Sequence, residues 1–76
     1  MMELKIKLET MKDAAMFVTK MENVAGDAVL KRGNQIVDAK SLIGVLQLGV
    51  GRESVLTLHG EQDQDALRDL LKDYIV

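Results

Sequence analysis

The sequence contains no cysteine and no tryptophan, and Phe17 and Tyr74 are its only phenylalanine and tyrosine. Without cysteine the chain can form neither a disulfide framework nor a thiolate metal site, which suits a reducing compartment. So few aromatic side chains leave no platform on which single-stranded nucleic acid could stack its bases. A net charge of only −2, with scattered lysines and arginines, also argues against direct nucleic-acid binding.

Long apolar runs are absent as well. The apolar segments are far too short to cross a bilayer, and no charged-then-apolar leader precedes the first predicted strand. We therefore expect a cytoplasmic protein without a membrane partner. A chain of 76 residues is expected to form a single domain, residues 1–76, with a thin core.

Patterns typical of catalysis or metal binding are also missing. Glu61, Asp63 and Asp65 lack the loop and the closing glutamate of an EF-hand calcium site. The pair Gly49 and Gly51 follows a predicted helix, whereas a phosphate-binding loop follows a strand. No nucleophile–base set appears, so we expect no enzyme, no cofactor and no bound metal. The only histidine, His59, is predicted to lie on a solvated sheet face.

Hydrophobic periodicity predicts the first strand and the first helix. Apolar and polar side chains alternate at the start of the chain, which indicates a half-buried strand whose inward residues are Met2, Leu4, Ile6 and Leu8. Thr10 and Asp13 then form a capping box. The following helix is predicted to run to about Asn23 and to bury a stripe at helical spacing, namely Ala14, Phe17, Val18 and Met21.

The remaining elements complete an alternating pattern. Residues 28–32 and 35–39 flank Gly33-Asn34, which suits a tight primed hairpin turn. Residues 54–59 form a predicted strand that turns Leu56 and Leu58 inward. A final helix follows residues 60–63 and is predicted to bury Leu67, Leu70, Leu71 and Tyr74. The order β-α-β-β-α-β-α predicts an α+β open-faced sandwich, with a four-stranded antiparallel sheet and three helices on one face.

Ser41 lies where an extended run stops and a short apolar helical run begins, which is the position of a helix N-cap. Its hydroxyl is expected to accept a hydrogen bond from the backbone N–H of Ile43 or Gly44. A serine in such a place most often only caps its helix. The predicted buried stripe is Leu42, Val45, Leu46 and Gly49, with Ile43 and Gln47 nearer solvent, and Gly49 is expected to end the helix in the left-handed conformation.

At this point the chain resembles HPr, the small phosphocarrier of the bacterial sugar phosphotransferase system. The resemblance covers nearly the whole chain and is densest in residues 39–50, which match the lysine–serine block before the second helix of that family. The hairpin at Gly33-Asn34 and the run Asp65-Ala66-Leu67 also fit. The resemblance implies an HPr-like fold over the whole chain.

One family motif is altered. HPr carries phosphate on a histidine within a Gly-x-His-x-Arg-Pro-Ala pattern before its first helix. Aligned through Ala14, this sequence has Thr10 at the histidine, Lys12 at the arginine and Asp13 at the proline. A threonine hydroxyl cannot accept and release a phosphoryl group as an imidazole does. In this respect the chain resembles the catabolite-repression HPr paralogues, which lack the histidine and keep the serine.

The resemblance therefore implies a regulatory protein in the control of carbon use. Ser41 corresponds to the serine that a dedicated HPr kinase phosphorylates, and the product would bind a LacI-type transcriptional regulator. The implied partner-binding residues are Lys12, Lys40, Leu42, Ile43, Leu46 and Gln47. Two alternatives remain at this stage: a constitutive protein-interaction module that uses the apolar patch without modification, and a divergent phosphocarrier.

Overall fold

Four strands and three helices alternate along the chain in the computed structural model, which describes all residues 1–76. In chain order they are β1 (Met2–Lys7), α1 (Met11–Met21), β2 (Ala28–Arg32), β3 (Gln35–Asp38), α2 (Leu42–Leu48), β4 (Glu53–Leu58) and α3 (Gln64–Leu70). The predicted order of elements is confirmed. None of the three helices combines the length and the hydrophobicity needed to span a bilayer.

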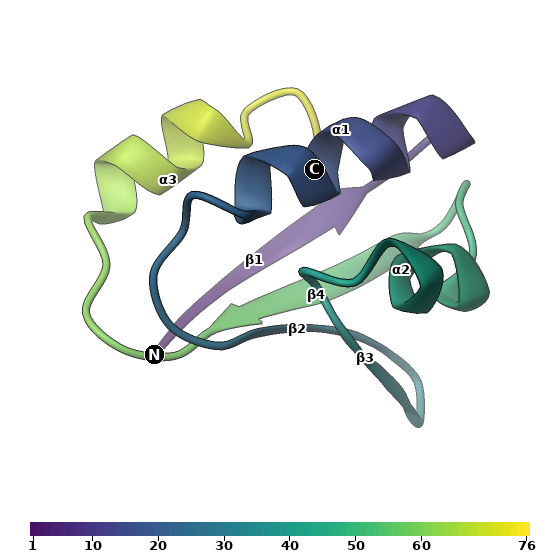
Figure 1. Cartoon of the computed structure of the whole chain (residues 1–76), viewed down its shortest axis with the longest axis horizontal. Helices are drawn as coiled ribbons and strands as arrows, with labels where there is room; N and C mark the ends of the chain where they lie inside the picture. Colours follow the sequence, from purple (N-terminus) through teal and green to yellow (C-terminus); the bar gives the residue numbers. More distant parts are fainter.

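The strands form one antiparallel sheet in the order β1-β4-β2-β3. All three helices pack on the same face and leave the other face open (Figure 1). Because β4 pairs with both β1 and β2, the strand that comes last in the chain lies inside the sheet. The predicted α+β open-faced sandwich, with a four-stranded antiparallel sheet and three helices on one face, is therefore confirmed.

The core lies between the sheet and the helices. The inward side chains of β1 are buried as predicted, and Leu56 and Leu58 of β4 are fully buried. The predicted stripe of α1 is also buried, with Phe17 at its centre. One residue on the open face departs from this pattern: Thr57 is only 1% exposed, and its hydroxyl has no hydrogen-bond partner. The register places it between Glu3 and Val29, which flank it on the neighbouring strands.

The boundaries of α1 follow from its caps. The hydroxyl of Thr10 accepts a hydrogen bond of 3.1 Å from the backbone N–H of Asp13. The carboxylate of Asp13 accepts in return from the N–H of Glu9 at 3.1 Å, one residue before the cap. This is the predicted capping interaction with its return bond shifted by one residue. The helix ends at Met21, two residues before the predicted end, with Glu22 as its C-cap.

The hairpin between β2 and β3 has the predicted two-residue turn, since Arg32 pairs with Gln35. Gly33 has a φ of +59° while Asn34 keeps a negative φ. A positive φ at the first central position defines a type II′ turn, one of the two primed types. The turn therefore favours glycine at its first position, as the sequence provides.

The C-terminal residues close the outer edge of β1. Asp63 caps α3 at its start. Beyond this helix the chain runs alongside β1, where Lys7 N–H donates to Tyr74 C=O at 2.8 Å and Val76 N–H donates to Lys5 C=O at 3.0 Å. The Tyr74 ring packs edge-on against Phe17, with centroids 5.9 Å apart. Burial, together with two nearby aspartates, raises the pKa of the Tyr74 hydroxyl.

We predict that Phe17→Ala lowers the free energy of unfolding by about 3–5 kcal/mol, because the substitution leaves a cavity where α1, the sheet and Tyr74 meet. Urea unfolding measures the change. Met16→Ala is the matched control on the same helix: Met16 is 46% exposed, so its truncation should change stability by about 0.5 kcal/mol or less. Similar losses for the two variants would contradict the observed packing.

Candidate functional site

Ser41 is the N-cap of α2, as the sequence predicts. Its hydroxyl accepts a hydrogen bond of 3.2 Å from the N–H of Gly44, and its carbonyl accepts from Val45 N–H at 2.9 Å. The turn before it is fixed by Asp38, whose carboxylate accepts from Lys40 N–H at 2.8 Å and whose carbonyl accepts from Ser41 N–H at 3.1 Å. Ser41 is thus held at the surface, half-buried, at the start of the helix.

The buried side of α2 differs from the predicted stripe. Val45 and Leu48 are buried, whereas Leu42 is 39% exposed. Helical Cα–Cβ bonds tilt toward the N-terminus, so the side chain of the first residue extends beyond the helix start while that of Leu48 points back to the core. Gly49 caps the helix, but with φ 97° and ψ 158° it does not adopt the predicted left-handed helical conformation. This conformation is also one that favours glycine.

Exposed apolar side chains beside Ser41 form what we call the α2 patch. Ile43 is 72% exposed and Leu42 39%, while Leu46 is half-buried against the core and Gln47 is exposed. All four are predicted partner-binding residues, and the structure brings them together with Ser41 on one short helix. Leu42 and Ile43 thus expose a small apolar area next to Ser41.

The two lysines that were predicted to bind a partner, Lys12 and Lys40, lie in different surroundings. The ammonium of Lys40 donates to the carbonyl of Val24, just beyond α1, so it anchors the start of α2 to the end of α1. Lys12 is exposed in the first turn of α1. The end of α2 lies near the beginning of α1, because Gly51 N–H donates to Leu8 C=O at 2.6 Å. Lys12 and Thr10 therefore lie toward the end of α2 that is opposite Ser41.

Sequence reasoning missed Arg32, which holds the other end of α2. Its guanidinium donates to the carbonyls of Leu48 and Gly49, the latter at 2.9 Å, and to the hydroxyl of Ser54 at 3.2 Å. A cation at a helix C-terminus offsets the negative end of the helix dipole. The only signal in the sequence for such a contact is that α2 has no basic residue of its own in its last turn. Locating the donor on β2 required the tertiary structure.

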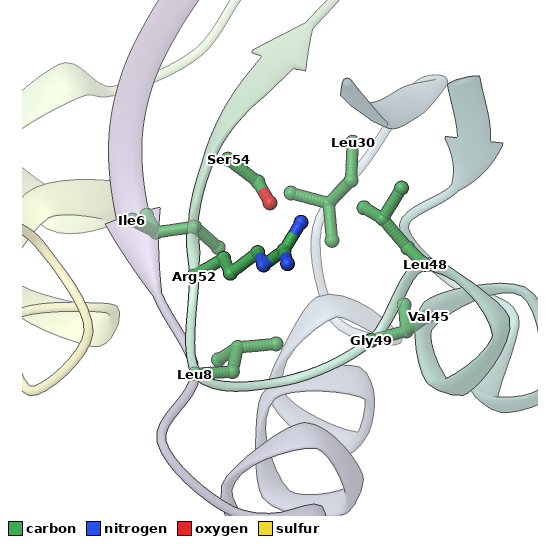
Figure 2. Close-up of a pocket in the computed structure, with 8 residues that line it drawn as sticks. All are labelled: Ile6, Leu8, Leu30, Val45, Leu48, Gly49, Arg52 and Ser54. Atoms are coloured by element: carbon green, nitrogen blue, oxygen red, sulfur yellow. The ribbon is translucent and has the colours of Figure 1, made fainter. Parts of the chain in front are cut away.

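A small cavity lies under this end of α2 (Figure 2). Its volume is about 10 Å³, and it is lined by Ile6, Leu8, Leu30, Val45, Leu48, Gly49, Arg52 and Ser54. The guanidinium of Arg52 points toward Ser54 in this space. A cavity of this volume accommodates about one water molecule and is too small for a cofactor. No three His, Cys, Asp or Glu side chains are grouped so that they could hold a metal ion.

We predict that Arg32→Met lowers stability by about 1–3 kcal/mol, because hydrogen bonds from a charged donor to several acceptors are lost together. Amide hydrogen exchange at Val45 and Gly49, which report on α2, should accelerate more than exchange in β1. Arg68→Met, at an exposed position of α3, is the control and should change stability by about 0.5 kcal/mol or less. Equal effects of the two substitutions would show that the Arg32 contacts do not hold the helix.

Comparison with known proteins assigns the family. The family model described as the PTS HPr component phosphorylation site matches residues 5–74. The HPr-like protein Crh of Bacillus subtilis (strain 168) is 37% identical over 59 residues, which cover 75% of this chain and 69% of that protein. The HPr-like protein Crh of Halalkalibacterium halodurans is 28% identical over 74 residues, which cover 91% of this chain and 88% of that protein.

A solved structure agrees with these sequence matches. HPr-C-His from Thermoanaerobacter tengcongensis superimposes with a TM-score of 0.79 and 26% sequence identity, over 95% of this chain and 89% of that chain. The agreement therefore extends over the sheet and all three helices. Since the family model spans nearly the whole sequence and both relatives cover most of it, the chain belongs to the HPr family.

Proposed function

We propose that this protein is a regulatory HPr in which a serine kinase of the HPr kinase type phosphorylates Ser41. The phosphorylated form then binds a partner protein in carbon-source regulation, a transcriptional regulator of the LacI type. The observation that carries the proposal is the position of the Ser41 hydroxyl, at the surface and at the start of the exposed α2 patch. The two relatives named HPr-like protein Crh support the same role.

The local geometry favours a switch that needs little refolding. A phosphate on Ser41 adds a charge of about −1.5 to −2 and retains oxygen acceptors where the hydroxyl now accepts from Gly44 N–H. The turn before Ser41 depends on Asp38 rather than on the hydroxyl, so it can remain in place. The modification therefore adds charge beside Leu42 and Ile43. A partner that places an arginine next to an apolar surface would distinguish the two forms.

The structure also bears on how Thr10 would behave in a phosphocarrier. Its hydroxyl accepts from Asp13 N–H, and the Asp13 carboxylate lies at the start of α1, where an incoming phosphate would have to bind. Thr10 lacks the nitrogen nucleophile that makes a phosphoryl group labile. These features support a regulatory role over phosphoryl transfer.

Incubation with the HPr serine kinase and ATP, followed by intact-mass measurement, should add one phosphate to the wild type and none to Ser41→Asn. We choose asparagine because its side-chain oxygen can still accept the capping hydrogen bond, so the helix is preserved. Ser54→Ala is the control, since Ser54 is only 7% exposed and should not be modified. Failure of the wild type to gain phosphate, or equal gain in Ser41→Asn, would refute the serine switch.

A pull-down with the partner protein distinguishes the constitutive interaction module from the serine switch. A pull-down with the LacI-type regulator should succeed with phosphorylated wild type and fail with both the unmodified protein and Ser41→Asn. Equal capture of all three would show that binding needs no phosphorylation and would support the constitutive alternative.

We also predict that enzyme I and labelled phosphoenolpyruvate leave the protein unlabelled. Thr10→His should recover little transfer, because Asp13 still places a negative charge at the start of α1 and Lys12 cannot form the bidentate contacts of an arginine. The double variant Thr10→His/Asp13→Pro, which removes the negative charge of Asp13, serves as the comparison. Acid-labile phosphate on His59 of the wild type would overturn the prediction.

A further inference from the structure

The two edges of the sheet differ in how they are covered. Residues Tyr74–Val76 cover the outer edge of β1 through two backbone hydrogen bonds, which together make an antiparallel bridge between Ile6 and Ile75. At the other edge, β3, no backbone hydrogen bond outside the sheet involves Gln35, Ile36 or Val37. Figure 1 shows β3 at the margin of the molecule, away from α1 and α3. One edge is therefore available for pairing with another chain.

The centre of β3 presents backbone groups outward. In an antiparallel hairpin closed by a two-residue turn, the pairs Arg32–Gln35 and Leu30–Val37 exchange the ladder hydrogen bonds. The N–H and C=O of Ile36 then point away from β2. β3 is short, with four residues, and ends in the charged Asp38, but it contains neither a lysine nor a proline. At its centre the Ile36 side chain is 61% exposed, so nothing covers the outward backbone groups there.

A groove of about 490 Å³ lies beside this edge, where β2 begins and β4 ends. Its polar side chains include the carboxylates of Asp27 and Asp38, both exposed, and the imidazole of His59. Lys40 also lines the groove, with its ammonium held on the Val24 carbonyl, and its charge offsets one of the two carboxylates. One carboxylate charge is left without a balancing lysine or arginine in the groove lining, which suits a cation.

Ile36 and Asp38 lie on the same face of β3, since they are two residues apart on a strand. Asp38 is opposite Val29, which also lines the groove. A chain paired antiparallel to β3 through Ile36 would place the residue two positions before its pairing residue next to Asp38. The edge and the groove can thus bind one extended segment together.

We propose that β3 binds an extended cationic segment of a partner protein as a fifth strand of the sheet. An aliphatic residue of this segment exchanges backbone hydrogen bonds with Ile36, and a lysine or arginine two positions earlier lies beside Asp27 and Asp38. Backbone pairing supplies affinity and the charged side chain supplies specificity. The surface uses none of the α2 patch residues, so the proposal does not depend on phosphorylation of Ser41.

A second copy of this chain fits the edge less well. Pairing of Ile36 with the same residue of another copy would place Asn34 opposite Asp38, so that no cation enters either groove. Each copy also carries a net charge of −2. Charge complementarity therefore favours a cationic partner segment over self-association.

The test is a titration of the ¹⁵N-labelled protein with the peptide acetyl-Thr-Arg-Thr-Val-Thr-amide, followed by NMR. The amide signals of Ile36 and Asp38 should shift in a saturable manner, together with those of Asp27 and His59. The matched peptide with glutamate in place of arginine should bind at least about two- to fivefold more weakly, since this is the range expected for the loss of an exposed charge pair. Shifts confined to α1 or α2, or none at millimolar peptide, would overturn the proposal.

Two variants separate the backbone contribution from the charge. Ile36→Pro removes an N–H that the sheet itself does not use and should abolish the shifts. Asp38→Asn keeps an oxygen that can accept from Lys40 N–H and should weaken binding about two- to fivefold, whereas Asp69→Asn on exposed α3 should not. Unchanged binding by Asp38→Asn would refute the charge contact. Concentration-dependent shifts of the same amides without peptide would assign the edge to a second copy and also overturn the proposal.

Discussion

The structure depends on the burial of one face of a single sheet under three short helices. Helices of seven to eleven residues are marginal on their own in water, since isolated helices shorter than about 12–15 residues rarely persist. Each helix must therefore be held by the apolar side chains that it shares with β1, β2 and β4. Phe17 lies at the centre of this arrangement, because it contacts Tyr74 and brings α1 together with the C-terminal segment that closes the edge of β1.

The helix that carries the candidate site has additional attachments. Lys40 ties its beginning to Val24, Arg32 binds the carbonyls at its end, and Val45 and Leu48 anchor its buried side. A two-turn helix is fixed in this way while its outer residues, among them Ile43, remain free. A rigid support with an exposed, modifiable surface suits the regulatory role that we propose for this member of the HPr family.

Local interactions could be predicted from the sequence, and tertiary ones could not. The caps at Thr10 and Ser41 were predictable because each side chain bonds to a backbone N–H three residues away. The resemblance to HPr indicated the overall fold. The prediction that Leu42 is buried was wrong. Helical spacing assigns faces as if the helix continued in both directions, whereas Leu42 is the first residue of a short helix. The Arg32 contacts and the uncovered edge at β3 depend on which strands are neighbours, and periodicity carries no information on strand order.

The strand order also has a consequence for folding. β1 and β2 never pair with each other, because both pair with β4, which begins more than 20 residues after β2 ends. The β2–β3 hairpin can form early from local contacts, but β1 must wait for a partner from the far end of the sequence. Closing such long loops before their contacts stabilise the structure slows folding. During synthesis the sheet can therefore be completed only after β4 has left the ribosome, and until then the backbone of β1 has no neighbouring strand.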